Sequence, residues 1–311
     1  MINICKPYVK EPVWNIAGLF CHDEDYLRFF NFLKNNNISN PIKYVYGSFL
    51  SKFEGGRTSQ SFITIEEAQD LIYQYNNLNI SCRLILSNHL IQKKDLEQDK
   101  HFNNLLSFLS TNNYKLNLKN GVTVTLDPIA EYIRQNYSNL EIVCSVIKPA
   151  IEVGWGLETV DYYNNLLSKY DFVVVNSGKV KDTNFIQKLQ YKEKIEVIIN
   201  SRCELNCPYS KQHYDITAKN VILNDNASLN LLQIAEQDIW KKCHANRSKT
   251  GILNGSNFSE EEINNLLNMN ITHFKMEGRE WPVQVLMRDF GDYIFNHYQL
   301  NRIYRKMGYL Y

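Results

Sequence analysis

The chain has 311 residues, of which 44% are hydrophobic and 22% charged, so it can bury a sizeable core in one or two domains. Its 34 basic and 33 acidic residues give a formal net charge of +1, which excludes the strongly basic composition typical of a polyanion-binding protein. No apolar run reaches the roughly 18 residues that cross a bilayer, and the N-terminus lacks a secretion signal. We therefore expect no membrane association and a cytoplasmic location.

Short apolar runs rich in Val, Ile, Tyr and Phe recur along the whole chain, and each ends in a turn-forming or polar residue. This composition is typical of strands buried on both faces. The runs are VWNIAGLF (13–20), IKYVYGSF (42–49), SCRLILSN (81–88), GVTVTLD (121–127), EIVCSVIKP (141–149), DFVVVNSG (171–178), IEVIINSR (195–202) and THFKMEGR (272–279).

Between these runs, apolar residues recur every three or four positions, which indicates amphipathic helices. We expect helices over 23–37, 64–78, 101–113, 127–137, 159–170 and 184–192, and one C-terminal helix over 292–311. Thr64 and Ser259 precede acidic residues, as helix N-caps do. A helix after each of eight strands predicts a parallel (β/α)8 TIM-like barrel. A doubly wound open sheet is the alternative, but no glycine-rich nucleotide-binding motif follows the first strand.

The regular alternation breaks after the seventh predicted strand. About sixty residues follow, with the helical segment 228–243 and the short runs KNVILND (219–225) and TGILNG (250–255), either of which is a candidate extra strand. We interpret the chain as a single barrel domain over 1–311 with an insertion at about 203–258. The insertion is expected to form an elaborated loop region on the face where barrel enzymes carry their active sites.

Two cysteines, Cys203 and Cys207, lie in the segment NSRCELNCPYSKQHYD, directly after the seventh predicted strand. His213 closes this segment and Cys243 lies in the same insertion. The chain has seven cysteines and no export signal, which favours reduced thiols or metal ligands over disulfides. Soft sulfur donors suit an iron-sulfur cluster or zinc and exclude magnesium and calcium.

The segment CELNCPYS also resembles the CxxxCxxC motif of radical S-adenosylmethionine enzymes, with Ser210 in place of the third cysteine. That family carries its motif after the first barrel strand, whereas here it follows the seventh. The resemblance is therefore a weaker alternative.

The segment FKMEGR (274–279) resembles a strand reading FKIEGR near the end of the barrel in family 32 of the unclassified (U) peptidases, the collagenase-like peptidases. Five of the six positions are identical. VYGSFLSKFEGGR, which ends at Arg57, is similar to an early strand and arginine-containing loop of that family.

This resemblance implies a TIM-like barrel and, by analogy with several family members, an oxygen-independent hydroxylation on RNA bases or quinone rings. It also implies a 4Fe-4S cluster with Cys203, Cys207 and Cys243 as ligands. The fourth ligand stays open among Cys144, His213 and the substrate; zinc is the alternative occupant.

Lys275, Glu277 and Arg279 alternate along the last predicted strand and should point to one side. We expect them to be catalytic residues that hold an anionic small molecule or RNA base, because guanidinium groups bind carboxylates and phosphates bidentately. The alternative is an internal ion-pair network that closes the barrel. Asn200 and Arg202, at the end of the seventh strand, together with Arg57, are expected to bind substrate.

Three functions remain open at this point. The first is an iron-sulfur or other thiolate-metal enzyme that modifies a small molecule or a nucleic-acid base. The second is a peptidase or other hydrolase, in which a cysteine and His213 would form a nucleophile pair. The third is a non-catalytic partner subunit with a structural metal, which would bind a protein partner or a second copy through the C-terminal helix.

Overall fold

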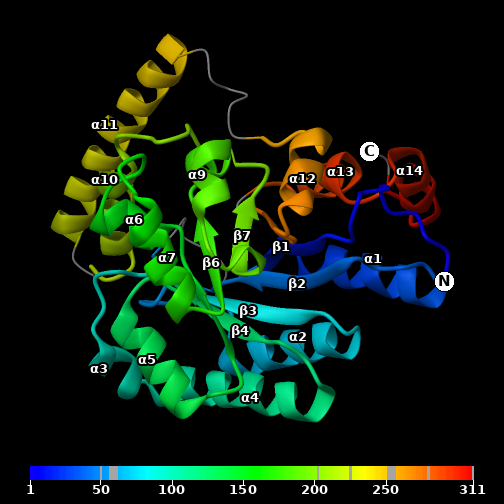
Figure 1. Cartoon of the computed structure of the whole chain (residues 1–311). Helices are drawn as coiled ribbons and strands as arrows, with labels where there is room; N and C mark the ends of the chain where they lie inside the picture. The colour runs from blue at the N-terminus through cyan, green and yellow to red at the C-terminus, as the bar shows by residue number, and fades with distance from the viewer. Residues whose placement is uncertain are drawn as a thin grey trace.

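The strands form one closed barrel in which every neighbouring pair is parallel, with β8 returning to β1. The computed structural model describes residues 1–49, 51–55, 62–201, 203–223, 226–250, 257–278 and 281–309. The predicted (β/α)8 barrel is confirmed, and each of the eight predicted strand segments contains a strand (Figure 1). The strands are β1 (Val13–Leu19), β2 (Ile42–Gly47), β3 (Ser81–Leu86), β4 (Gly121–Val124), β5 (Glu141–Cys144), β6 (Phe172–Val175), β7 (Ile195–Ile198) and β8 (His273–Met276).

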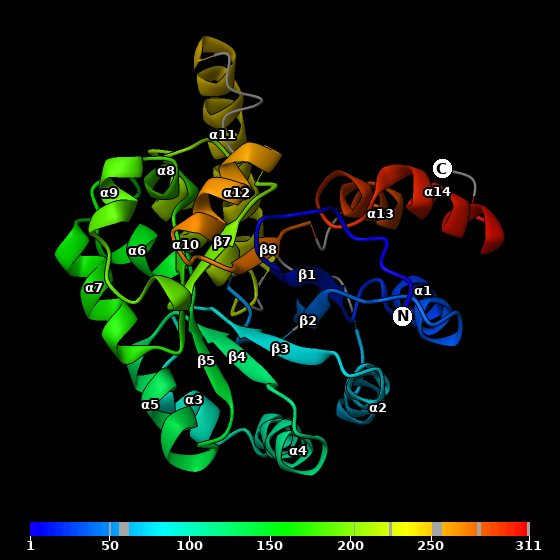
Figure 2. The ribbon, with the colours of Figure 1, turned by 45° about the vertical axis from the view of Figure 1, so that its right-hand side comes forward.

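Helices surround the barrel and cover the outward faces of the strands (Figure 2). They include a helix in each predicted helical segment, and Thr64 and Ser259 each form a capping box at a helix start, as expected. In chain order they are α1 (Asp23–Asn35), α2 (Ile65–Asn77), α3 (Lys93–Glu97), α4 (Lys100–Leu116), α5 (Asp127–Asn136), α6 (Ile147–Glu152), α7 (Val160–Lys169), α8 (Ser177–Val180), α9 (Thr183–Lys188), the 3-10 helix η1 (Lys192–Lys194), α10 (Ser210–Asn220), α11 (Asn226–Thr250), α12 (Glu260–Asn268), α13 (Val283–Tyr293) and α14 (His297–Lys306).

The barrel has two distinct hydrophobic regions because side chains alternate along each strand. Outward residues such as Val197 and Phe274 join the large core beneath the helices. Inside the barrel the apolar residues are few and fall into two small clusters, one of which is formed by Ala17, Tyr46 and Ile85. Charged and polar side chains occupy much of the remaining interior, which gives the site its chemistry.

The segment after β7 contains two further helices before α12. The predicted helix over 228–243 is part of α11, which extends away from the barrel (Figure 1). The candidate strand at 219–225 is wrong for its described residues, because α10 continues to Asn220 and a turn follows. Most of the other candidate strand, 250–255, lies outside the described residues.

The predicted C-terminal helix over 292–311 is present as α14, but it starts later than expected, because residues 292 and 293 end a separate helix that was not predicted. That helix, α13, ends at Tyr293, and α14 starts after Asn296. The Asn296 side chain accepts a hydrogen bond from the Gln299 backbone N–H, as an N-cap does. Phe295, buried between the two helices, pairs with Cys5 near the N-terminus. In the part of the chain that the structure describes, no helix has the length and apolar composition needed to cross a bilayer.

Candidate functional site

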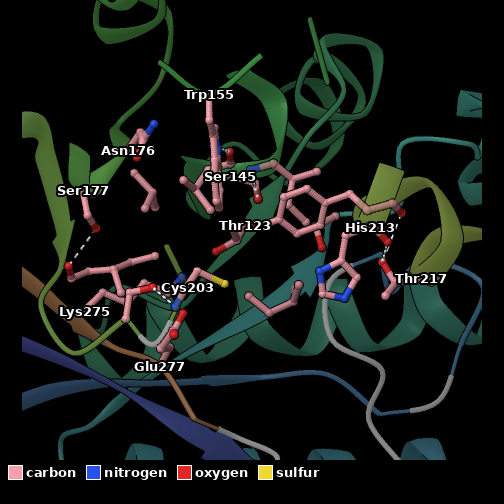
Figure 3. Close-up of a pocket in the computed structure, with 18 of the residues that line it drawn as sticks. Thr123, Ser145, Trp155, Asn176, Ser177, Cys203, His213, Thr217, Lys275 and Glu277 are labelled. Atoms are coloured by element: carbon pink, nitrogen blue, oxygen red, sulfur yellow. Dashed lines mark hydrogen bonds between the residues drawn. The ribbon is translucent and has the colours of Figure 1, made fainter. Parts of the chain in front are cut away.

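A pocket of about 140 Å³ opens at the C-terminal ends of the strands, where barrel enzymes carry their active sites (Figure 3). Its floor consists of inward side chains near the strand ends, and its walls are formed by loops and by α10. Residues that line it include Ser87 after β3, Thr123 on β4, Ser145 after β5, Ser177 after β6, Cys203 after β7, and Lys275 and Glu277 at β8.

Lys275 and Glu277 both line this pocket, which agrees with the expectation that they point to one side. Lys275 is buried, and its ammonium lies 3.9 Å from the ring centroid of Tyr46 and 3.7 Å from a carboxylate oxygen of Glu196. It therefore belongs to the ion-pair network inside the barrel and also contacts the pocket. Directly after Glu277, Gly278 has a φ of +130°, a conformation in which a Cβ would be strained.

Asn200 positions Glu277. Its side-chain amide donates to the Glu277 carbonyl oxygen at 3.1 Å and to the Asp289 carboxylate at 2.9 Å, and its Oδ1 accepts from the Glu277 N–H at 2.8 Å. The side chain thus pairs with the backbone of Glu277 on both sides, and Asp289 fixes its orientation. Asn200 is absent from the pocket lining, so its place fits a positioning role better than the substrate contact predicted for it.

The predicted metal ligands Cys203, Cys207, Cys243 and His213 line one smaller cavity of about 40 Å³ beside the pocket. Cys203 and His213 also line the pocket itself, so the two spaces share a wall. Cys243 reaches this cavity from α11 although it is distant in sequence from the Cys203 loop. Ser210, which takes the third cysteine's place in the CxxxCxxC-like pattern, lines the same cavity.

The cavity is unfavourable for bare thiolates. Burial raises the pKa of Cys207 to about 11, and the neighbouring Cys203, Cys243 and Glu204 act in the same direction. A bound cation would reverse this effect, since a metal binds the deprotonated thiol. Among the described residues, however, no three His, Cys, Asp or Glu side chains are grouped closely enough to hold a metal ion as they stand. The donor types fit a thiolate metal, and binding would require the sulfurs to draw together.

Cys144 is less suited to binding a metal than the three cysteines of the cavity. Cys144, which the resemblance left open as a fourth ligand, is fully buried in the outer core, and burial holds the pKa of its thiol far above the ordinary value. It does not line the cavity. His213 lines the cavity beside the three thiols, and its ring lies 5.6 Å from that of Trp240 on α11.

Side-chain contacts hold the helix α10 against the segment that follows β3. These contacts keep the loop that carries Cys203 and Cys207 over the C-terminal end of the barrel. Asn88 donates to the Ala218 carbonyl oxygen at 3.2 Å, and His89 Nε2 lies 2.6 Å from an Asp215 carboxylate oxygen. On the other side of the pocket, Trp155 packs edge-on against Tyr214 at 5.8 Å between ring centroids. These contacts build the pocket wall from segments far apart in the sequence.

Three of the predicted site residues, Arg279, Arg57 and Arg202, lie outside the described residues. The expectation of an anionic substrate rested largely on Arg279 and stays a prediction. The charged side chains that the structure does place in the pocket lining are Lys275 and the carboxylates of Glu204 and Glu277. Ser87 and Thr123 were missed by the sequence reasoning, although alternation in GVTVTLD would have placed Thr123 inward with Gly121.

No family model and no curated protein sequence matches this chain. Among solved structures, a U32 peptidase superimposes with a TM-score of 0.47 at 12% identity, covering 71% of this chain and 82% of its own. A GH18 chitinase from Pseudoalteromonas aurantia gives 0.35 at 12% identity, covering 60% and 80%. A maltogenic alpha-amylase from Thermotoga neapolitana gives 0.32 at 9% identity, covering 60% and 54%. These likenesses are remote.

Proposed function

We propose that the chain is a barrel enzyme that modifies a small molecule, or a base of a nucleic acid, in the rim pocket beside a thiolate-bound metal centre. The observation that carries this proposal is the shared wall: Cys203 and His213 line both the pocket and the cavity that Cys207 and Cys243 complete. A metal there would lie next to a substrate bound in the pocket.

The donor set limits the metal. Three thiols and an imidazole are ligands for a 4Fe-4S cluster or for zinc, and a cluster with three cysteine ligands leaves one iron for His213 or for substrate. A cluster would supply electron transfer and zinc would supply a Lewis acid. Burial raises the pKa of Cys207, so metal binding would release protons from the thiols and affinity should fall as pH falls.

The side chains of β8 supply polar chemistry at the same pocket. The ammonium of Lys275, held by Glu196 and the Tyr46 ring, can orient an oxygen atom of the substrate. Glu277, held in place through its backbone by Asn200, can accept or donate a proton at the substrate. Their neighbouring positions favour an enzyme over a partner subunit with a structural metal.

The test is the metal content of protein purified without oxygen. We expect iron and sulfide in equal amounts with broad visible absorbance, or else one equivalent of zinc in colourless protein. Cys203→Ser and Cys207→Ser should each lower the metal content strongly. Cys5→Ser is the matched control, since Cys5 pairs with Phe295 near the N-terminus, does not line the cavity, and should keep full metal content.

Two results would contradict the proposal. Protein without metal, even after reconstitution with iron and sulfide or with zinc, would remove the metal centre. In that case a nucleophile formed by Cys203 and His213, both of which line the pocket, would become the favoured reaction centre. Full metal content in Cys203→Ser would show that the ligands lie elsewhere.

A further inference from the structure

Two buried hydroxyl groups on the floor of the pocket have no hydrogen-bond partner among the residues that the structure describes. Ser87 is 1% exposed and Thr123 is 3% exposed, and both line the pocket. Neither side-chain oxygen has a partner within the described part of the protein. Burying a hydroxyl without a partner is unfavourable, so a pair of them at one place requires an explanation.

Neighbouring hydroxyls at the same end of the barrel are paired. Thr125 donates to the Ser87 carbonyl oxygen at 2.9 Å, Ser177 donates to the Ile198 carbonyl oxygen at 3.1 Å, and Ser145 accepts from the Ile147 N–H at 3.2 Å. Among the described side chains that line the pocket, Ser87 and Thr123 are those whose buried hydroxyls lack a partner. Figure 3 shows Thr123 among the side chains that line the pocket.

The charges around the floor disfavour an additional negative charge. The cations Arg83 and Lys275 are matched by the carboxylates Glu196 and Glu141 in an ion network inside the barrel. In the described pocket lining, Lys275 is accompanied by two carboxylates. A neutral group that both donates and accepts hydrogen bonds fits this surrounding better than a carboxylate or phosphate does.

The size and walls of the pocket limit the rest of the ligand. Its volume of about 140 Å³ is close to that of a cavity that holds one benzene molecule, roughly 150 Å³. Ile85, Val174 and Ile198 contribute apolar walls next to the floor. The space therefore suits one compact ring with a polar tip.

We propose that the pocket floor, formed by Ser87 and Thr123, is a binding subsite for a neutral hydroxyl or carbonyl group on a compact, ring-sized ligand. This inference rests on the proposed function in taking the rim pocket as the substrate pocket, but it does not depend on the metal. In this arrangement the hydroxyl or carbonyl group is the part of the ligand that lies at the pocket floor.

The experiment uses cyclohexanol as a neutral probe and cyclohexanecarboxylate as its charged counterpart, with binding followed by ligand-observed NMR. We expect the parent protein to bind cyclohexanol more tightly than cyclohexanecarboxylate. Thr123→Val keeps the shape of the side chain and removes the hydroxyl, and it should weaken cyclohexanol binding by about five- to tenfold, the effect of one lost hydrogen bond. Ser87→Ala should act in the same direction.

Thr125→Val is the matched control, because it removes a hydroxyl two residues further along the chain that is paired and does not line the pocket. It should keep cyclohexanol binding and lower Tm by about 2 to 4 °C. Thr123→Val should leave Tm unchanged or raise it, because the hydroxyl that it removes has no partner among the described residues.

Equal binding of cyclohexanol by the parent, Thr123→Val and Ser87→Ala would overturn the subsite. Tighter binding of the carboxylate would overturn its neutral character and favour the anionic substrate. These outcomes are separate from the metal test. Metal-free protein that binds cyclohexanol through Thr123 would contradict the metal centre alone, and metal-loaded protein whose Thr123→Val variant binds like the parent would contradict the subsite alone.

Discussion

The lower interior of the barrel and the pocket floor both hold buried polar groups, but they differ in whether those groups are paired. In the lower interior, Arg83 donates to Glu196 at 2.5 Å and to Glu141 at 3.1 Å, and its guanidinium lies 3.8 Å from the ring centroid of Tyr44. On the floor, the Ser87 and Thr123 hydroxyls have no partner in the described protein. The first arrangement maintains the fold and the second is available to a ligand.

The energetics of the ion network explain how the charges remain inside. Burial acts to raise the pKa of Glu196, but the positive charges of Arg83 and Lys275 outweigh it and hold the pKa below its ordinary value. Glu196 is therefore ionised at neutral pH. Even here Glu196 Oε1 and Arg83 Nε lack hydrogen-bond partners among the described residues. Loss of one member of the network would therefore leave a buried charge poorly compensated.

The largest expected effect comes from removing the central cation. Arg83→Met leaves the fully buried Glu196 without its closest partner and should lower the free energy of unfolding by about 3 to 5 kcal/mol, as measured by urea denaturation. The double variant Arg83→Met with Glu196→Gln should recover a large part of this loss. A loss below about 1 kcal/mol in the single variant would contradict the role of the ion network in maintaining the fold, because the network would then contribute little to stability.

A smaller effect is expected from His273, at the start of β8, through pH. Burial, with a contribution from Arg83, lowers the pKa of His273 to about 4, below the unfolded value near 6.5. The unfolded chain therefore binds a proton in this range before the folded chain does, so stability is lost as pH falls from about 6.5 to about 4. Allowing for partial exposure, the loss should be about 2 to 3 kcal/mol.

The measurement compares the parent with His273→Gln by urea unfolding at pH 7 and at pH 4. The stability of the parent relative to the variant should fall by that amount between the two pH values. Asp23, whose pKa burial raises to about 6, acts with the opposite sign but is present in both proteins and cancels. A constant difference between the two proteins would show that His273 titrates normally.

The smallest of the three effects concerns Asn200, a paired polar side chain just after β7. Asn200→Ala removes the hydrogen bonds to the Glu277 N–H and carbonyl oxygen and should lower the free energy of unfolding by about 1 to 2 kcal/mol. Glu277→Gln keeps those backbone contacts and should be as stable as the parent. If Asn200→Ala unfolds like the parent, its pairing with Glu277 does not contribute to stability.

The strand and helix positions could be predicted because they depend on local patterns. β-branched and aromatic runs, helical periodicity and the caps Thr64 and Ser259 are all local, and each predicted strand is present. The C-terminal helix was predicted, but its start after Asn296 was missed because Asn296 falls inside a continuous helical pattern. Its capping hydrogen bond and the burial of Phe295 against other elements outweigh that pattern.

By itself, the sequence determined the barrel, the placement of Cys203 after a late strand, and the shared side of Lys275 and Glu277, since side-chain alternation is a steric property of each strand. The tertiary structure decided which inward residues meet. Arg83 and Glu196 are 113 positions apart and pair because barrel closure and strand register bring β3 opposite β7. The approach of α11 brings Cys243 to the Cys203 loop, and the depth of each inward residue puts Thr123 on the pocket floor. Such contacts depend on register and packing across the whole chain.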